Sequence, residues 1–74
     1  MTKRNQHVVP HGDKWAVKSE GSRRPSSVHD TQREAIERAR ELARNQQVEL
    51  FVHRRDGRIR ARDSYGNDPF PPKG

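Results

Sequence analysis

The stretch VELFVHRRDGRIRARD, residues 48–63, constrains the fold most, because it predicts a β-hairpin with two chemically different faces. Asp56 and Gly57 form a strong two-residue hairpin signal, since both tolerate the positive φ that a type I′ turn requires. With Arg55 opposite Arg58, the remaining cross-strand pairs are Arg54 with Ile59, His53 with Arg60, Val52 with Ala61, Phe51 with Arg62, and Leu50 with Asp63.

Side chains alternate across a strand, so this register gives the hairpin one apolar face and one basic face. We assign the apolar face to the core; it carries Val48, Leu50, Val52, Ile59 and Ala61. The other face carries Glu49, Phe51, His53, Arg55, Arg58, Arg60 and Arg62. This second face is cationic with an aromatic among its charges, and it is the main functional lead in the sequence.

Another hairpin is predicted nearer the N-terminus, where HVVPH and KWAVKS flank Gly12-Asp13, a pair compatible with a tight primed turn. Pairing His11 with Lys14 gives an apolar face of Val8, Pro10, Trp15 and Val17. The opposite face is mostly basic and carries His7, Val9, His11, Lys14, Ala16 and Lys18. Pro10 cannot donate a ladder hydrogen bond, so we expect this first strand at a sheet edge.

A single amphipathic helix is predicted between the hairpins. Thr31 and Glu34 match the capping box that begins a helix, and Asn45 is a suitable left-handed residue for its end. Apolar residues at helical spacing form one stripe, which comprises Ala35, Ile36, Ala39, Leu42 and Ala43. Residues 26–29 are compatible with a short extra strand before the helix.

These elements predict an α+β two-layer sandwich in the order β-β-(β)-α-β-β, with an antiparallel sheet of two hairpins and the helix on one sheet face. We expect residues 1–6 to be a flexible basic arm, 7–63 the single domain and 64–74 a Pro/Gly-rich tail. The predicted core is Val8, Trp15, Val17, Ile36, Ala39, Leu42, Val48, Leu50, Val52 and Ile59. Tyr65 and Phe70 either dock on apolar surface or belong to a free tail; the sequence is compatible with both.

The composition favours a polyanionic partner. The chain has 74 residues with a net charge of +6 and a pI near 10.8, and arginine outnumbers lysine twelve to four. Residues 30–44 contain four acids and four arginines, so the excess positive charge lies elsewhere. With only 27% hydrophobic residues, we expect a marginally stable monomer or a homodimer. The chain has no cysteine and no span near the roughly 20 apolar residues of a membrane helix, so we expect a cytoplasmic protein without membrane contact.

Catalytic and metal sites are not expected. The SSVHD stretch at 26–30 contains a serine, a histidine and an acid, but such residues are also what a loop leading into a helix N-cap contains. His7 and His11 are four residues apart, which on a strand separates them by about 13 Å, too far for one tetrahedral metal ion. We therefore predict a non-enzymatic protein with no metal, no cofactor and no small-molecule substrate.

Two aromatic residues have competing interpretations. Trp15 is in register with Val8 and Val17, which favours the core, although an aromatic on a sheet also stacks on bases. Phe51 alternates out of the apolar face, which leaves it a stacking platform, a dimer contact, or an apolar residue covered by arginine stems or the tail. Basic residues on a strand also protect sheet edges from aggregation, but like charges side by side carry a folding cost that an anionic partner would relieve.

Three stretches of the chain carry a resemblance to a known family: the Trp15 strand within HVVPHGDKWAVKSEG, the helix segment AIERARELA and the ending SYGNDPFPP. Together they resemble a bacterial family of small uncharacterised proteins, domain of unknown function 2188. The resemblance covers nearly the whole chain. It implies a small bacterial protein and carries no assigned activity.

The leading hypothesis is a nucleic-acid-binding module, including DNA as a ligand, that uses its open sheet face with little sequence specificity. The residues predicted to form the site are Lys14, Lys18, Phe51, His53, Arg55, Arg58, Arg60 and Arg62. The alternative is a homodimeric or protein-binding module in which the same face, with Phe51 and the C-terminal tail, contacts a protein.

Overall fold

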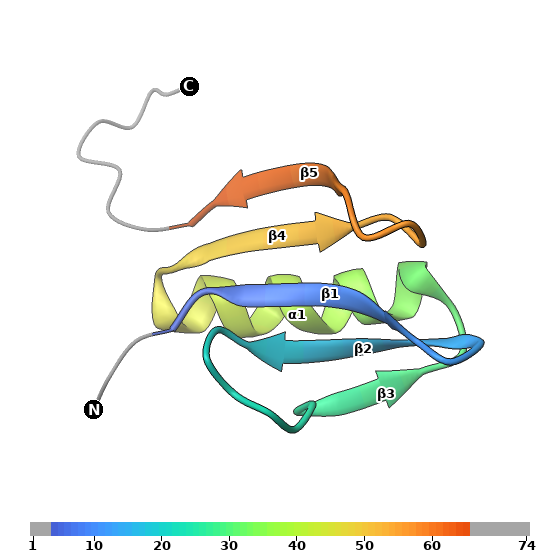
Figure 1. Ribbon diagram of the computed structural model, residues 1–74. Helices are drawn as coiled ribbons and strands as arrows, with labels where there is room; N and C mark the ends of the chain where they lie inside the picture. The colour runs from blue at the N-terminus through green and yellow to red at the C-terminus, as the bar shows by residue number, and fades with distance from the viewer. Residues whose placement is uncertain (1–3, 66–74) are drawn as a thin grey trace.

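The computed structural model describes residues 4–65, which form a five-stranded sheet with one helix packed on one face (Figure 1). The elements follow the chain as β1 (Gln6–His11), β2 (Lys14–Ser19), β3 (Ser27–His29), α1 (Gln32–Gln46), β4 (Glu49–His53) and β5 (Ile59–Ser64). The α+β class, the single helix and the short strand before it are therefore confirmed. No helix within residues 4–65 is long and apolar enough to cross a membrane.

The sheet is mixed, so the prediction of a wholly antiparallel sheet was wrong. Its strand order is β3-β2-β1-β4-β5, and β1 runs parallel to β4 while the other neighbours are antiparallel. The prediction that β1 lies at an edge was also wrong. Pro10 is tolerated in this central strand because the pairing with β4 ends at Val8, so no partner on that side needs an N–H from residue 10.

The first hairpin has the predicted register. His11 pairs with Lys14 and Val8 with Val17, and Gly12 has a φ of 65° at the turn. Since Asp13 does not share this positive φ, the turn has the φ pattern of type II′. Gln6 at the start of β1 is fully buried, and its amide nitrogen donates to the carbonyl oxygen of Arg4 and to the Ser19 hydroxyl. The strand thus begins one residue before the predicted domain boundary.

The second hairpin departs from the predicted register near its turn. The loop is closed by a backbone hydrogen bond from Arg54 to Arg58, and Gly57 alone has positive φ in it, so it is one residue longer than a type I′ turn. His53 consequently pairs with Ile59 rather than with Arg60. An irregularity in β5 at Arg60 then restores the predicted register, which includes Val52 with Ala61, Phe51 with Arg62, and Leu50 with Asp63.

This bulge exchanges the faces of Ile59 and Arg60, and it removes the open-face position that the uninterrupted register gave to Arg58. Ile59 follows His53 onto the face away from the helix and is 56% exposed, so its assignment to the core was wrong. Arg60 instead reaches α1, where its guanidinium donates to the side-chain oxygen of Gln32 at 2.5 Å. A bulge places an extra residue in one strand and changes side-chain directions locally, which an uninterrupted alternation cannot predict.

Helix α1 begins as its capping box predicts and ends slightly later than expected. The Thr31 hydroxyl accepts a hydrogen bond from the Glu34 N–H at 3.2 Å. At the other end, Gln47 rather than Asn45 takes the left-handed conformation, with φ 57°. The Val48 N–H donates to the Ala43 carbonyl at 3.0 Å and the Gln47 N–H to Arg44, which is a Schellman motif.

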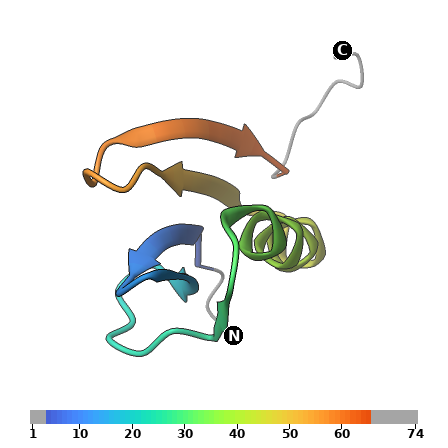
Figure 2. The same ribbon diagram turned by 90° about the vertical axis from the view of Figure 1, so that its right-hand side faces the viewer.

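The core lies between α1 and the sheet. Fully buried alanines of the predicted helix stripe, Ala35, Ala39 and Ala43, let the helix approach the sheet closely, while Ile36 and Leu42 are partly buried beside them. The sheet side of the core consists of Val8, Trp15, Val17, Val48, Leu50 and Val52. The helix packs on β1 to β4, and β5 extends the sheet beyond it, as the end-on view shows (Figure 2). The opposite face of the sheet, here called the open face, is left without a covering element among residues 4–65.

Candidate functional site

The open face has a stacked pair of rings near its centre. His7 on β1 and Phe51 on β4 are paired by the parallel register, and their ring centroids are 5.1 Å apart with an interplanar angle of 19°. Lys18 pairs with His7 on one side and Arg62 pairs with Phe51 on the other. These four residues form one row across β2, β1, β4 and β5, here called the platform row. At about 4.8 Å between strands, the row is roughly 14 Å long.

A hydrogen-bonded chain of side chains orients the His7 ring. The distance from His7 Nδ1 to His53 Nε2 is 3.0 Å, and the distance from His7 Nε2 to Glu20 Oε1 is 3.2 Å. His53 Nδ1 lies 3.4 Å from the carbonyl oxygen of Gly57. A carboxylate and a carbonyl only accept, so His7 Nε2 donates to Glu20 and His53 Nδ1 donates to Gly57 in the two outer contacts. In the contact between the two histidines, one ring nitrogen donates and the other accepts.

Glu20 is the acidic member of this chain. Its hydrogen bond with His7, joined by one from the Asn5 amide, holds the pKa of the Glu20 carboxyl below its ordinary value. A shallow hollow of about 210 Å³ lies beside these residues. It is lined by His7, Val9, Lys18, Ser19, Glu20, Gly21, Ser22 and His53. The platform row therefore borders a recess that carries both signs of charge.

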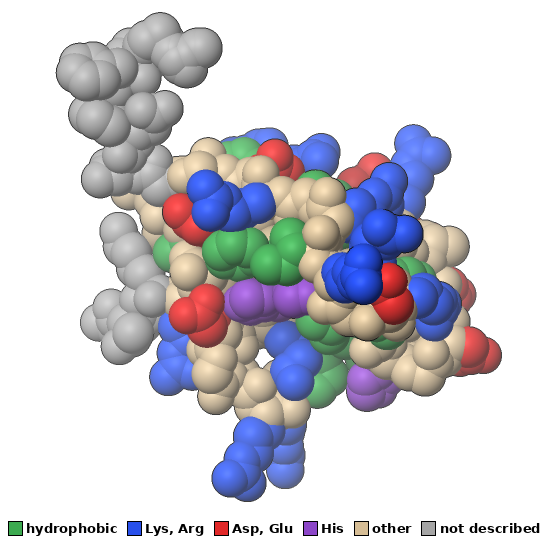
Figure 3. All heavy atoms as spheres, turned by 45° about the horizontal axis from the view of Figure 1, so that its top comes forward, with side chains coloured by type: hydrophobic (Ala, Val, Ile, Leu, Met, Phe, Trp, Pro, Cys, Tyr) green, Lys and Arg blue, Asp and Glu red, His purple; other side chains and the backbone are tan. Residues whose placement is uncertain are grey.

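A second row on the open face is apolar. Val9, Ala16 and Val28 are paired across β1, β2 and β3, and Ala16 is fully buried by its surroundings on this face. Val28 and Ile59 are the large hydrophobic residues exposed among residues 4–65, at 41% and 56%. In the space-filling view, hydrophobic side chains adjoin a pair of histidines, with lysines and arginines around them (Figure 3). The open face is thus less uniformly basic than predicted.

The structure separates the eight predicted site residues into two groups. Four of them make no side-chain hydrogen bond or ion pair within residues 4–65: Lys18, Phe51, Arg58 and Arg62. Among these, Phe51 stacks on His7. The other four make side-chain hydrogen bonds with other residues of the chain: Lys14, His53, Arg55 and Arg60.

The engaged residues contribute mainly to the fold. Lys14 pairs with Asp30 on the exposed edge, and this hydrogen bond raises the pKa of Lys14 and lowers the pKa of Asp30. Arg55 donates to the carbonyl oxygens of Gly12 and Asp13 at 3.0 and 3.2 Å. Its guanidinium lies 4.8 Å from the centre of the Trp15 ring, which is 7% exposed in the core. Trp15 is therefore a core residue, as its register favoured.

Sequence reasoning placed His7 on the open face but did not predict its stack on Phe51. The contact depends on the parallel pairing of β1 with β4, two strands separated by more than 35 residues of chain. A usable signal was present in Val8 and Val9, which are both apolar: consecutive apolar residues are typical of a strand covered on both sides and so of a central position. Glu20 was missed because it follows its strand in a loop.

These features define a small α+β protein with one helix on a mixed five-stranded sheet and an aromatic, basic-edged open face. The chain belongs to the DUF2188 family, described as an uncharacterized protein conserved in bacteria, whose model matches residues 6–65. The chain is also similar to the uncharacterized protein YdaT of Bacillus subtilis strain 168, with 44% identity over 62 residues. That match covers 84% of this chain and 41% of the relative, so the chain spans about two fifths of YdaT. No solved structure matches the chain.

Proposed function

We propose that this protein is a non-enzymatic module that binds single-stranded nucleic acid on its open face with little sequence specificity. Bases stack on the exposed surface of the His7–Phe51 pair, and phosphates contact Lys18 and Arg62. The observation that carries the proposal is the platform row, in which two stacked rings lie between a lysine and an arginine. Aromatic platforms flanked by positive charge are a general means of holding unpaired bases. A cytoplasmic location stays a prediction.

Single-stranded ligands fit this row better than a duplex. A base can stack only when it is not already stacked in a helix, and a sheet-borne aromatic supplies the surface for it. Lys18 and Arg62 lie at the two ends of the row, so a strand crossing the sheet meets a positive charge on either side of the rings. Stacking discriminates weakly between bases because each has a π face.

The test is a fluorescence anisotropy titration of labelled oligo(dT) and of a matched duplex, repeated over a salt series. Phe51→Ala is expected to weaken single-strand binding by about 1–3 kcal/mol and to leave duplex binding nearly unchanged. Replacing Lys18 and Arg62 with Gln is expected to lower the salt slope for single strands by about 1.4, at about 0.7 per phosphate contact.

The matched control replaces Arg33 and Arg38 on α1 with Gln, which changes the net charge equally on the other side of the molecule. This control variant is expected to bind like the wild type. If both double variants lose the same affinity, the attraction is a property of net charge and not of the open face. If the wild type fails to bind any nucleic acid at low salt, the proposal is wrong.

A second candidate function is a sheet-face contact with a second copy or another protein. The observation that favours it is the apolar surface of the open face, where Val28 is exposed on one edge strand and Ile59 on the other. Sedimentation velocity of the wild type and of Phe51→Ala separates the candidates, because the protein-contact proposal requires a salt-tolerant dimer that Phe51→Ala shifts toward monomer.

A further inference from the structure

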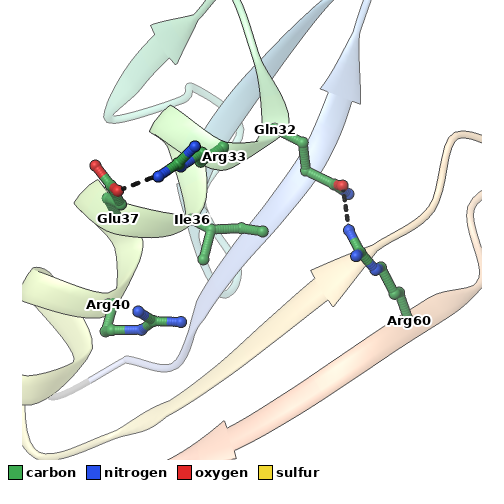
Figure 4. Close-up of a pocket in the computed structure, with 6 residues that line it drawn as sticks. All are labelled: Gln32, Arg33, Ile36, Glu37, Arg40 and Arg60. Atoms are coloured by element: carbon green, nitrogen blue, oxygen red, sulfur yellow. Dashed lines mark hydrogen bonds and ion pairs between the residues drawn. The ribbon is translucent and has the colours of Figure 1, made fainter.

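A groove of about 490 Å³ lies on the helix side of the molecule, between α1 and β5. It is lined by Gln32, Arg33, Ile36, Glu37, Arg40 and Arg60. Figure 4 shows Ile36 and Arg40 directed from α1 toward the strands and Arg60 directed from β5 toward the helix. The groove forms because the helix packs on β1 to β4 and leaves β5 uncovered. The bulge at Arg60 directs its side chain to the helix side of the sheet, where it contacts Gln32.

The groove is chemically suited to an occupant with one apolar and one acidic side chain. Ile36 supplies its apolar surface and packs against the core on its other side. Arg33 has Glu37 at 3.8 Å, and Arg60 is held by Gln32. Within residues 4–65, Arg40 has no such acidic neighbour in salt-bridge range, so its guanidinium is available to a carboxylate.

The chain approaches the groove at the end opposite to Arg60. The Tyr65 N–H donates to the carbonyl oxygen of Val48 at 3.2 Å, and the Tyr65 side chain packs against the core. The Arg44 guanidinium lies 5.8 Å from the centre of the Tyr65 ring. Arg44 is one helical turn from Arg40, and Ile36 lies one turn further along the same side of α1. Tyr65 therefore lies at one end of the row Arg44, Arg40 and Ile36 on α1, of which Arg40 and Ile36 line the groove.

We propose that the segment following Tyr65 occupies this groove, with the Phe70 ring on Ile36 and the Asp68 carboxylate at Arg40. The sequence after Tyr65 reads GNDPF, which supplies one acid and one large apolar side chain. Eight helical residues from Arg44 to Ile36 correspond to about 12 Å, whereas five residues of extended chain span at most about 16–18 Å. The segment is long enough to reach, with little slack.

The prolines make this docking less costly. Pro69 and Pro71 flank Phe70 and each fixes φ near −65°, which reduces the conformational freedom lost when the segment is held in place. The charges are complementary, because a single acid meets a groove in which three arginines face one glutamate. The docked segment would cover Ile36 and the helix-facing side of β5, where Ala61 is exposed. This inference is independent of the open face and of its proposed ligand.

The direct test is an NMR experiment on the full 74-residue chain. Nuclear Overhauser contacts are expected between the Phe70 ring and the Ile36 methyl groups, and Phe51→Leu identifies the Phe70 signals because the chain has two phenylalanines. A mixed sample of labelled and unlabelled chains distinguishes contacts within one chain from contacts between copies. Absence of the contacts, or contacts only between copies, would overturn the proposal.

Thermal melts provide the second readout. Phe70→Ala and Asp68→Asn are each expected to lower Tm by several degrees, and Lys73→Gln is the control that leaves Tm unchanged. Asp68→Asn and Arg40→Gln are expected to be non-additive, since either change removes the same ion pair. Equal Tm values for Phe70→Ala, Asp68→Asn and the control would contradict docking.

Discussion

The bulge at Arg60 makes a quantitative prediction about two residues of the second hairpin. Ile59 is 56% exposed on the open face, whereas Val52 in the paired strand is 2% exposed in the core. The test replaces each with threonine, which keeps the β-branch; the change is mainly one of polarity for valine, and for isoleucine it also removes the Cδ1 methyl. The comparison therefore reports burial at each position.

The expected costs differ several-fold. Val52→Thr places a hydroxyl in the core, where a polar group without a hydrogen bond costs about 1–3 kcal/mol. Ile59→Thr removes apolar area that is already more than half in water, so at about 25 cal/mol per Å² its cost stays below about 1 kcal/mol. For a domain of this size, 1 kcal/mol shifts Tm by about 4–8 °C.

Urea unfolding followed by Trp15 fluorescence measures both variants, because Trp15 is the single tryptophan and is buried in the core. An unchanged slope with urea confirms that only stability has changed. If Ile59→Thr costs as much as Val52→Thr, Ile59 is a core residue, the hairpin has the uninterrupted register, and Arg60 belongs to the open face after all.

Two further predictions concern the helix end and the exposed ion pair. Gln47→Gly is expected to raise the free energy of unfolding by up to about 1 kcal/mol, because Gln47 has φ 57° and glycine adopts this conformation without a steric penalty; a loss of stability in urea would contradict this. Lys14 lowers the pKa of Asp30, so the pair contributes stability above the ordinary carboxyl pKa and loses it as pH falls through the folded-state pKa. The Tm difference between wild type and Asp30→Asn should accordingly disappear on acidification, and a difference that persists at acid pH would mean that the carboxylate is not its source.

Local signals in the sequence predicted local structure well. The first turn, the capping box at Thr31 and the alanine stripe of α1 are each encoded within a few residues, and each is confirmed. The α+β class follows from these elements, since one amphipathic stripe can be buried only against one sheet face.

Features that depend on distant pairing were not predictable in the same way. The parallel contact of β1 with β4 joins segments with no shared turn, and it places His7 against Phe51. The bulge at Arg60 leaves no trace in the alternation, because an extra residue changes which face each neighbour occupies without changing residue types. Three of the basic residues predicted for the site donate hydrogen bonds to carbonyl, amide or carboxylate oxygens of the same chain, which only the three-dimensional structure reveals.

The central claim is that unpaired nucleic acid binds on the open face, and chemical-shift mapping tests it most directly. Amide ¹H–¹⁵N spectra of the full chain are recorded at low salt while a short single-stranded oligonucleotide is added. The account predicts that the largest changes occur at His7, Lys18, Phe51 and Arg62, with α1 nearly unaffected. Spectra that do not change, or changes concentrated on α1, would contradict it.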